Sequence, residues 1–123
     1  MARDFTELDA WQIAVELKKW VYVLVRRPVV ARDGRLVSQI VDAARSGPRN
    51  VAEGFGRFHR KEFAQFLKVA IGSEQEVRNH ILDAFDCGYI TAAERDEGVV
   101  LSKRAVAAAL ALRRYLLSDR NPY

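Results

Sequence analysis

Three side chains that could share a metal or pass a proton fall on one face of a predicted helix. Glu76, His80 and Asp83 are spaced i, i+4 and i+7, which stacks them one turn apart. Carboxylate and imidazole groups at this spacing can hold a metal, but di-iron bundles take Glu-x-x-His pairs from two helices and further glutamates. The only other histidine, His59, falls in a predicted loop. We therefore interpret the cluster as a hydrogen-bonded surface or subunit contact, and we expect no metal and no cofactor.

The remaining nucleophiles and glycines do not form a catalytic set. Ser73 and His80 lie two helical turns apart, too far for a nucleophile and its base. Cys87 has no histidine near it in sequence, and we expect it to be a small buried residue near a helix end. The segment 54–56, Gly-Phe-Gly, is too short for a dinucleotide fingerprint and follows no predicted strand. We expect no catalytic residues, and so a protein that is not an enzyme.

Positive charge is concentrated in one part of the chain, although the net charge is only +4. Residues 26–68 hold ten Lys and Arg against four acids, whereas residues 69–97 hold two against seven. This pattern fits a basic patch that attracts polyanions, and it equally fits a solvated helical surface with scattered ion pairs. The candidate nucleic-acid-binding residues are all cationic: Arg45, Arg49, Arg57, Arg60, Lys61, Arg113 and Arg114.

Two aromatic residues, Phe55 and Phe58, are interleaved with the cations near the second predicted connection. Exposed rings there could stack on unpaired bases while the cations neutralise phosphates. The interpretation that we favour is that both rings anchor the connection in the core. No base-recognition motif is present, so binding would rest on phosphate contacts with little base readout.

The apolar spacing predicts an all-α protein with four helices, over residues 6–26, 35–53, 60–87 and 92–117. Asp4 or Thr6 is the expected N-cap of the first helix, and residues 28–34 are expected to form a loop. A capping box, Thr91 to Glu94, begins the fourth helix. The connections are short, so neighbouring helices should run antiparallel in an up-down-up-down bundle.

Glycine and proline positions predict where these helices are interrupted. Gly47 and Pro48 fall inside the second helix, so we expect a kink or a local break there. Gly54 and Gly56 should stop that helix by allowing a positive φ. Gly98 is expected to split the fourth helix, and residues 118–123 to be a frayed tail.

Several residues around this point are better explained by structure than by chemistry: Asn50, Glu53, Gly54, Ser73 and Glu76. We expect Asn50 to bond backbone freed by Pro48, and Arg49 to pair with Glu53. Glu76 could pair with Arg57 across the bundle or across a subunit boundary.

Length and composition limit the class of protein. The chain has 123 residues, enough for a single domain over 1–123 with a core of its own. No run of about 18 uncharged apolar residues occurs, so we expect no membrane span. The N-terminal residues carry acids where a signal peptide needs an apolar run, and one cysteine allows no intrachain disulfide. A reducing cytoplasm fits these features.

Residues 105–112, Ala-Val-Ala-Ala-Ala-Leu-Ala-Leu, are apolar around the whole helix. Such a helix is usually buried on more than one side, which in a small chain favours self-association. The alternative is that alanine is simply a good helix former.

Residues 50–57, Asn-Val-Ala-Glu-Gly-Phe-Gly-Arg, are followed by Phe63, by Gly72-Ser73 with Glu76, and by Gly88-Tyr89. This order resembles the 23S rRNA intervening-sequence protein family, four-helix bundle proteins of the ribosomal-protein-like type. The Leu8, Trp11 and Ala14 spacing is similar to the first helix of that family. The resemblance covers roughly residues 5–117.

The resemblance implies an antiparallel four-helix bundle that assembles as a homo-oligomeric ring, a homopentamer. A similar bundle is the accessory protein of diversity-generating retroelements, where it works with a reverse transcriptase and nucleic acid. This chain has Asp42 where the family usually has an arginine, and Gly47 where it has a β-branched apolar residue. The missing cation weakens a nucleic-acid argument at that position.

Two functions remain open from the sequence. The first is a non-catalytic protein that binds RNA or DNA through a basic oligomer surface. The second is a scaffold or adaptor ring that recruits a protein partner and does not touch nucleic acid. We expect the chain itself to be one of its own partners, and no membrane to be involved.

Overall fold

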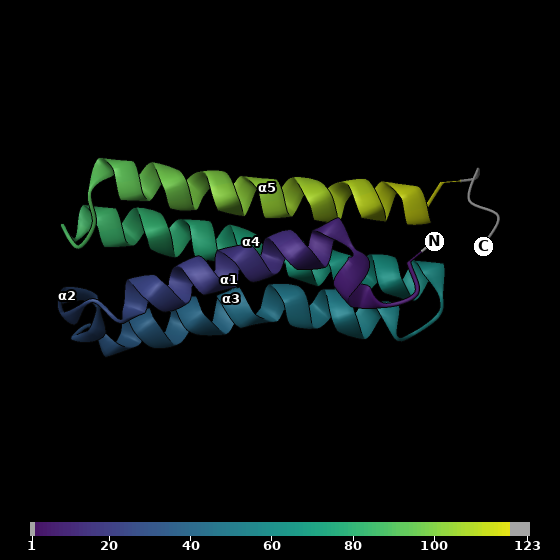
Figure 1. Ribbon diagram of the computed structural model, residues 1–123, viewed down its shortest axis with the longest axis horizontal. Helices are drawn as coiled ribbons and strands as arrows, with labels where there is room; N and C mark the ends of the chain where they lie inside the picture. The colour runs from purple at the N-terminus through teal and green to yellow at the C-terminus, as the bar shows by residue number, and fades with distance from the viewer. Residues whose placement is uncertain (1, 119–123) are drawn as a thin grey trace.

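A computed structural model describes residues 2–118, and no strand occurs within them. Four long helices lie side by side (Figure 1). A 3₁₀ turn and a short helix complete the element order η1 Phe5–Glu7, α1 Asp9–Val25, α2 Pro28–Ala31, α3 Gly34–Phe55, α4 Arg60–Asp86 and α5 Ala92–Leu116. The predicted all-α architecture is confirmed, while residues 119–123 of the predicted frayed tail lie outside the described residues.

Consecutive long helices run in opposite directions (Figure 1). The α1 helix packs against α3 and α5, and α4 packs against the same two helices. The ends of α3 and α5 and the beginning of α4 therefore meet at one end of the bundle, together with the N-terminal segment (Figure 1). Residues that are far apart in the sequence are brought together at this end.

The first helix begins later than predicted. The expected N-cap residue Asp4 caps η1 instead. The Glu7 carboxylate accepts a hydrogen bond from the backbone N–H of Asp4 at 3.0 Å. Leu8 then adopts an extended conformation and becomes the N-cap of α1. This bend lets Phe5 pack edge-on against Trp11, with ring centroids 5.5 Å apart. The aromatic contact and the bond between Asp4 and Glu7 both stabilise this bend.

The predicted loop over 28–34 contains the short helix α2. Pro28 is its first residue, where a proline loses no hydrogen bond and its φ already suits a helix. The next helix begins at Gly34, and the Asp33 side chain caps it by accepting from the Leu36 N–H at 3.1 Å. Asp33 also accepts from the Tyr89 hydroxyl at 3.0 Å, which ties this end of α3 to the turn after α4.

Of the kink or local break predicted at Gly47 and Pro48, the break does not occur, since α3 is helical from Gly34 to Phe55. Gly54 does not stop the helix either: it is buried within it, and Gly56 has an ordinary φ of −71°. A Cβ on Gly54 would lie 2.7 Å from both Phe63 and Phe66 of α4. The missing side chain therefore serves close helix packing, not chain reversal.

The predicted split of α5 at Gly98 does not occur, because the helix is unbroken. Gly98 also allows close helix packing. A Cβ there would lie 2.6 Å from the Trp20 ring and 2.9 Å from Ile81. The indole N–H of Trp20 donates to the Glu97 carboxylate at 2.8 Å, which fixes the ring over the glycine. The other helix boundaries follow the prediction, with Gly88 at a φ of +77° after α4.

The predicted capping box of α5 is confirmed. The Thr91 hydroxyl accepts from the Glu94 N–H at 3.1 Å, and the Glu94 carboxylate accepts from the Thr91 N–H at 2.8 Å. Glu94 also pairs with Arg27, just after α1. The Thr91 backbone hydrogen bond is the main cause of the lowered pKa of Glu94.

Buried residues form two apolar clusters along the bundle. The larger cluster contains Leu17, Val21, Leu24, Val30, Leu36, Ile40, Ala43, Ala44, Val77, Ile81, Ala84, Ile90 and Ala105. The smaller cluster contains Ala10, Val51, Phe63, Leu67, Ala70, Ala109 and Leu116. Trp20 packs against the larger cluster and Trp11 against the smaller one.

The apolar segment 105–112 of α5 contributes to both clusters but is not covered on all sides. Ala105 and Ala109 are buried, whereas Ala107 and Ala111 are exposed. The opposite side of α5 therefore presents small apolar residues outward. Within residues 2–118, no helix combines the length and the apolarity needed to cross a membrane.

Substituting Gly54 with alanine should destabilise the fold. The added methyl group has no room against Phe63 and Phe66, and overpacking of this kind costs about 1–3 kcal/mol. Gly72→Ala is the matched control, because Gly72 is exposed on α4 with no atom near its missing Cβ. There, alanine should stabilise the helix by about 0.5–1 kcal/mol. Urea unfolding followed by circular dichroism measures both; a Gly54→Ala protein as stable as the wild type would contradict the packing argument.

Candidate nucleic-acid interface

The histidine and carboxylate cluster of α4 proves to be one hydrogen-bonded pair. The Nε2 atom of His80 lies 3.1 Å from the Glu76 carboxylate, and Asp83 is exposed one turn further along α4. No group of three or more metal-binding side chains is found among residues 2–118. The pair agrees with the predicted hydrogen-bonded cluster.

The other nucleophiles are occupied or remote. The Ser73 hydroxyl lies 2.6 Å from the Ser46 hydroxyl across the α3–α4 interface. Cys87 lies at the C-cap of α4, near a helix end as predicted, but it is exposed and not buried. The helix stops one residue before it, so its side chain faces solvent in the turn that leads to Gly88.

Asn50 is buried and belongs to the same polar contact as the two serines. Its Nδ2 donates to the backbone carbonyl of Ser46 at 2.8 Å and to the Ser46 hydroxyl at 3.0 Å. The carbonyl that Pro48 leaves without its helical donor is that of Ala44, four residues before it. The predicted bond to backbone freed by the proline is therefore wrong, and Asn50 instead reinforces the turn that contacts Ser73.

Glu74 is the most unusual residue of this region, and the sequence analysis did not single it out. Its side chain is 1% exposed, and neither carboxylate oxygen has a hydrogen-bond partner among the described residues. On α4 it lies between Ala70 of the smaller cluster and Val77 of the larger one. A Cβ on Gly47 would lie 3.2 Å from its Oε2, so the glycine makes room for the carboxyl group.

Burial without a partner raises the pKa of Glu74 to about 8. The side chain is therefore a neutral carboxylic acid over most of the physiological pH range. A buried, unpaired acid in a core otherwise made of apolar side chains lowers the free energy of unfolding, and the size of this loss depends on pH.

Two predicted ion pairs are replaced by others. Glu53 accepts from Arg57 at 3.1 Å, one turn later, and not from Arg49. Glu76 is engaged with His80, so it does not pair with Arg57 within the chain. Both pairs form within one helix or its first following turn, where i,i+4 side chains are neighbours.

The cations predicted to form one cluster near the α3–α4 connection separate into two groups. Arg45 lies about 18 Å along α3 from Arg57, at 1.5 Å per residue. Its Nε donates to the Tyr22 hydroxyl at 3.0 Å, and its guanidinium lies 5.6 Å from the ring centroid. Lys18 approaches the same ring at 5.8 Å. Arg45 is therefore held against α1, and exposed Arg49 lies one turn further along α3.

The second group lies at the end of the bundle. The guanidinium of Arg57 stacks over the Phe66 ring at 5.0 Å. Arg60 and Lys61 begin α4, and Arg113 and Arg114 lie in the last turn of α5. Arg114 is exposed, whereas Arg113 is half-buried with its Nε enclosed and unbonded among the described residues. The topology thus brings together cations that the sequence separates by some fifty positions.

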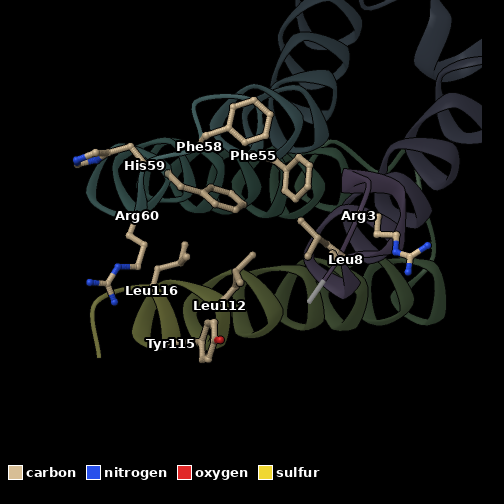
Figure 2. A pocket seen from close by; sticks show the side chains of 11 residues that line it. Arg3, Leu8, Phe55, Phe58, His59, Arg60, Leu112, Tyr115 and Leu116 are labelled. Atoms are coloured by element: carbon tan, nitrogen blue, oxygen red, sulfur yellow. The ribbon is translucent and has the colours of Figure 1, made fainter. Parts of the chain in front are cut away.

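A cavity of about 350 Å³ opens at this end of the bundle, and Arg60 is one of its lining residues. Phe55 and Leu116 contribute apolar walls, and Phe58 and His59 come from the connection (Figure 2). Phe63 also lines the cavity. Phe55 packs edge-on against Phe63 with centroids 6.2 Å apart, so it anchors the connection as favoured from the sequence. Phe58 does not: it is 75% exposed and has a positive φ of 54°.

The sequence analysis did not name three residues at this end of the bundle as candidate site residues. Arg3, Leu112 and Tyr115 line the cavity from the N-terminal segment and from α5. Figure 2 shows Arg3 and Arg60 on opposite sides of the apolar lining. Arg3 precedes the first helical stripe, so no periodicity could mark it. Tyr115 directly follows the basic pair of α5, which was the one available signal.

A model of the 23S rRNA-intervening sequence protein family matches residues 6–106. The chain belongs to this family. The match covers α1 to α4 and more than half of α5, so the resemblance seen in the sequence is confirmed. In this 23S rRNA-intervening sequence protein, the end cavity is built partly from residues outside the matched range. No curated protein matches the chain.

Replacing Glu74 with glutamine should remove a pH dependence of stability. The folded-state pKa of about 8 lies above the ordinary value of 4.5, so the wild type is most stable when the acid is protonated. That stability is lost progressively as pH rises from about 4.5 to about 8, by about 1.4 kcal/mol for each pKa unit. Glutamine has nearly the same shape and cannot ionise.

Urea unfolding of both proteins at pH 5, 7 and 9 measures this effect. The difference between the two proteins cancels every pH-dependent contribution that they share. We expect similar stabilities at pH 5 and an increasing advantage of Glu74→Gln at pH 7 and 9. A difference that stays constant with pH would show that Glu74 is ionised in the folded protein.

Proposed function

We propose that this protein is a non-catalytic, homo-oligomeric bundle that associates with RNA or DNA through the basic end of the subunit, and that it acts in the cytoplasm. The observation that carries the proposal is the convergence of Arg3, Arg60 and Lys61 beside the exposed ring of Phe58. Arg113 and Arg114 add positive charge at the same end of the bundle, in the last turn of α5. These cations come from three separate segments of the chain. Such a convergence supports an anion-binding surface better than scattered surface charge does.

The mechanism would be electrostatic. Lys61 and Arg114 are exposed, and each would neutralise a phosphate and release a condensed counterion. The stacking of Arg57 on Phe66 would hold its guanidinium in place while its ion pair with Glu53 screens part of its charge. Arg45 and Arg49, further along α3, would extend the contact if the nucleic acid runs along the bundle. Contacts of this kind fix orientation and carry little sequence information.

The proposal includes assembly into a ring of five subunits, following the family resemblance. The outward side of α5 supports a subunit contact there, because it presents the small residues Ala107 and Ala111 beside exposed Val100. A ring would repeat the basic end in every subunit. Weak contacts made several times on one strand give an avidity well above that of a single contact.

The second candidate function is a protein-binding scaffold. Val23, Val69 and Val100 are each more than half exposed, on α1, α4 and α5. Such side chains favour contacts between proteins, although subunit assembly would use the same surface. A scaffold that also recruits a nucleic-acid enzyme would combine both functions.

Charge reversal at the basic end tests the nucleic-acid proposal. Lys61→Glu with Arg114→Glu should weaken binding of a fluorescently labelled RNA by at least about tenfold, and it should lower the slope of log affinity against log salt by about one per lost phosphate contact. Both residues are exposed, so the fold should not change. Arg45 is unsuitable because its bond to Tyr22 is part of the α1–α3 packing.

The matched control is Arg32→Glu with Arg35→Glu. These residues are also exposed, just after α2 and at the start of α3, and they change the net charge equally. We expect the control to bind within about threefold of the wild type. Equal losses in both variants would mean that net charge alone matters; absence of wild-type binding at low salt would leave the scaffold as the working function.

Assembly is tested separately by light scattering coupled to gel filtration. The wild type should have a mass near five times its subunit mass of 14.0 kDa. Ala107→Glu should lower that mass, because it places a charge on the proposed α5 contact. Ala93→Glu is the control: it is also exposed on α5, in the first turn, where an acid suits the helix dipole. A monomeric wild type would rule out the ring.

A further inference from the structure

The end cavity has the composition of a ligand site. Its lining is mostly aromatic and aliphatic, from Phe55, Phe63, Leu112 and Leu116, and its volume is about 350 Å³. Binding sites for small ring-shaped groups are typically of this size, apolar inside and polar at a few points of the rim. The rim here carries Arg3, His59 and Arg60.

The backbone at Phe58 is the second observation. A bulky L-residue at a φ of 54° is disfavoured and costs on the order of 1 kcal/mol or more. The ring is nevertheless 75% exposed, so burial of the ring does not account for the strain. The Phe55 and Phe58 ring centroids lie 6.4 Å apart in a tilted arrangement, and both residues line the cavity. A strained backbone that displays an aromatic ring at a cavity is typical of a binding residue.

Charge and shape together select the occupant. Figure 2 shows the guanidinium groups of Arg3 and Arg60 at the two sides of the apolar lining, directed away from it. A flat, uncharged ring would enter between them, while negative charges attached to that ring would remain outside, next to the cations. Lys61 continues the basic rim beside Phe58, His59 and Arg60. A nucleotide within a single strand has this arrangement: a flat base and phosphates on both sides.

We propose that the cavity at the end of the bundle receives one unpaired base of a single-stranded nucleic acid, stacked on Phe58. This inference rests on the proposed association with RNA or DNA and adds a preference for single strands. A paired base is stacked inside a duplex and cannot enter, so a duplex reaches only the cationic rim. Base–aromatic stacking is tolerant of sequence, which agrees with the lack of a base-recognition motif.

The test compares a 12-nucleotide unstructured RNA with its duplex, by anisotropy at one salt concentration, on wild type and variants. Phe58→Gly removes the ring and suits the positive φ, so the fold is kept. We expect the wild type to bind the single strand at least about fivefold tighter than the duplex. Phe58→Gly should lose about fivefold or more for the single strand and less than twofold for the duplex. Phe58→Trp should retain single-strand binding.

Val29→Ala is the control, because it removes an exposed apolar side chain from α2, at the opposite end of the bundle from the cavity. A second readout locates the base: 5-bromouridine in the single strand should crosslink on irradiation to the segment containing Phe58, His59 and Arg60. Crosslinks confined to other segments, or equal losses for both forms of RNA in Phe58→Gly, would overturn this inference and leave phosphate binding intact. A wild type that binds neither form would overturn the proposed function itself.

Discussion

Along the α3–α4 interface, small residues of one helix face large or polar side chains of the other. Gly54 receives Phe63 and Phe66, and Gly47 receives the carboxyl group of Glu74. Directly beside the Gly47–Glu74 contact, the Ser46 and Ser73 hydroxyls meet at 2.6 Å. Because these contacts follow one another in antiparallel order, a slip of either helix would drive a side chain into a backbone with no room for it. The register of the whole bundle depends on this interface.

The same interface positions the basic end. Gly54 lies in the last turn of α3, so close packing continues until the chain leaves the helix. Phe55 then packs on Phe63, which fixes one side of the connection, and His59 caps α4 by accepting from the Glu62 N–H at 3.3 Å. Phe58 is held between these two fixed points in its unfavourable conformation. The core therefore supplies the stability that the exposed ring and the clustered cations cost.

The sequence predicted the helices well because their apolar stripes and caps are local signals. Thr91, Glu94 and Gly88 behave as predicted for this reason. The errors concern residues whose meaning depends on another helix: Gly54 and Gly98 are read as helix breakers in isolation, yet each faces an aromatic ring from elsewhere in the chain. At both positions, tertiary packing outweighs the low intrinsic preference of glycine for a helix.

The candidate site shows the same contrast between features marked by local signals and features that depend on tertiary contacts. The basic residues could be named from composition, but the cavity could not, because it needs Arg3, Phe58 and Tyr115 from three distant segments. Glu74 was indistinguishable from the other acids of a charged stretch. Only the surrounding helices reveal that it is buried, and no local pattern marks a carboxyl group that lies between two apolar clusters.

The placement of the tryptophans has a practical consequence. Trp11 and Trp20 lie on one helix, yet each packs against a different apolar cluster, and the Glu74 carboxyl group lies between the clusters. The intrinsic emission of each indole therefore responds to the loosening of its own half of the core. Two proteins that each retain a single tryptophan would show whether the halves melt as one cooperative unit or in succession.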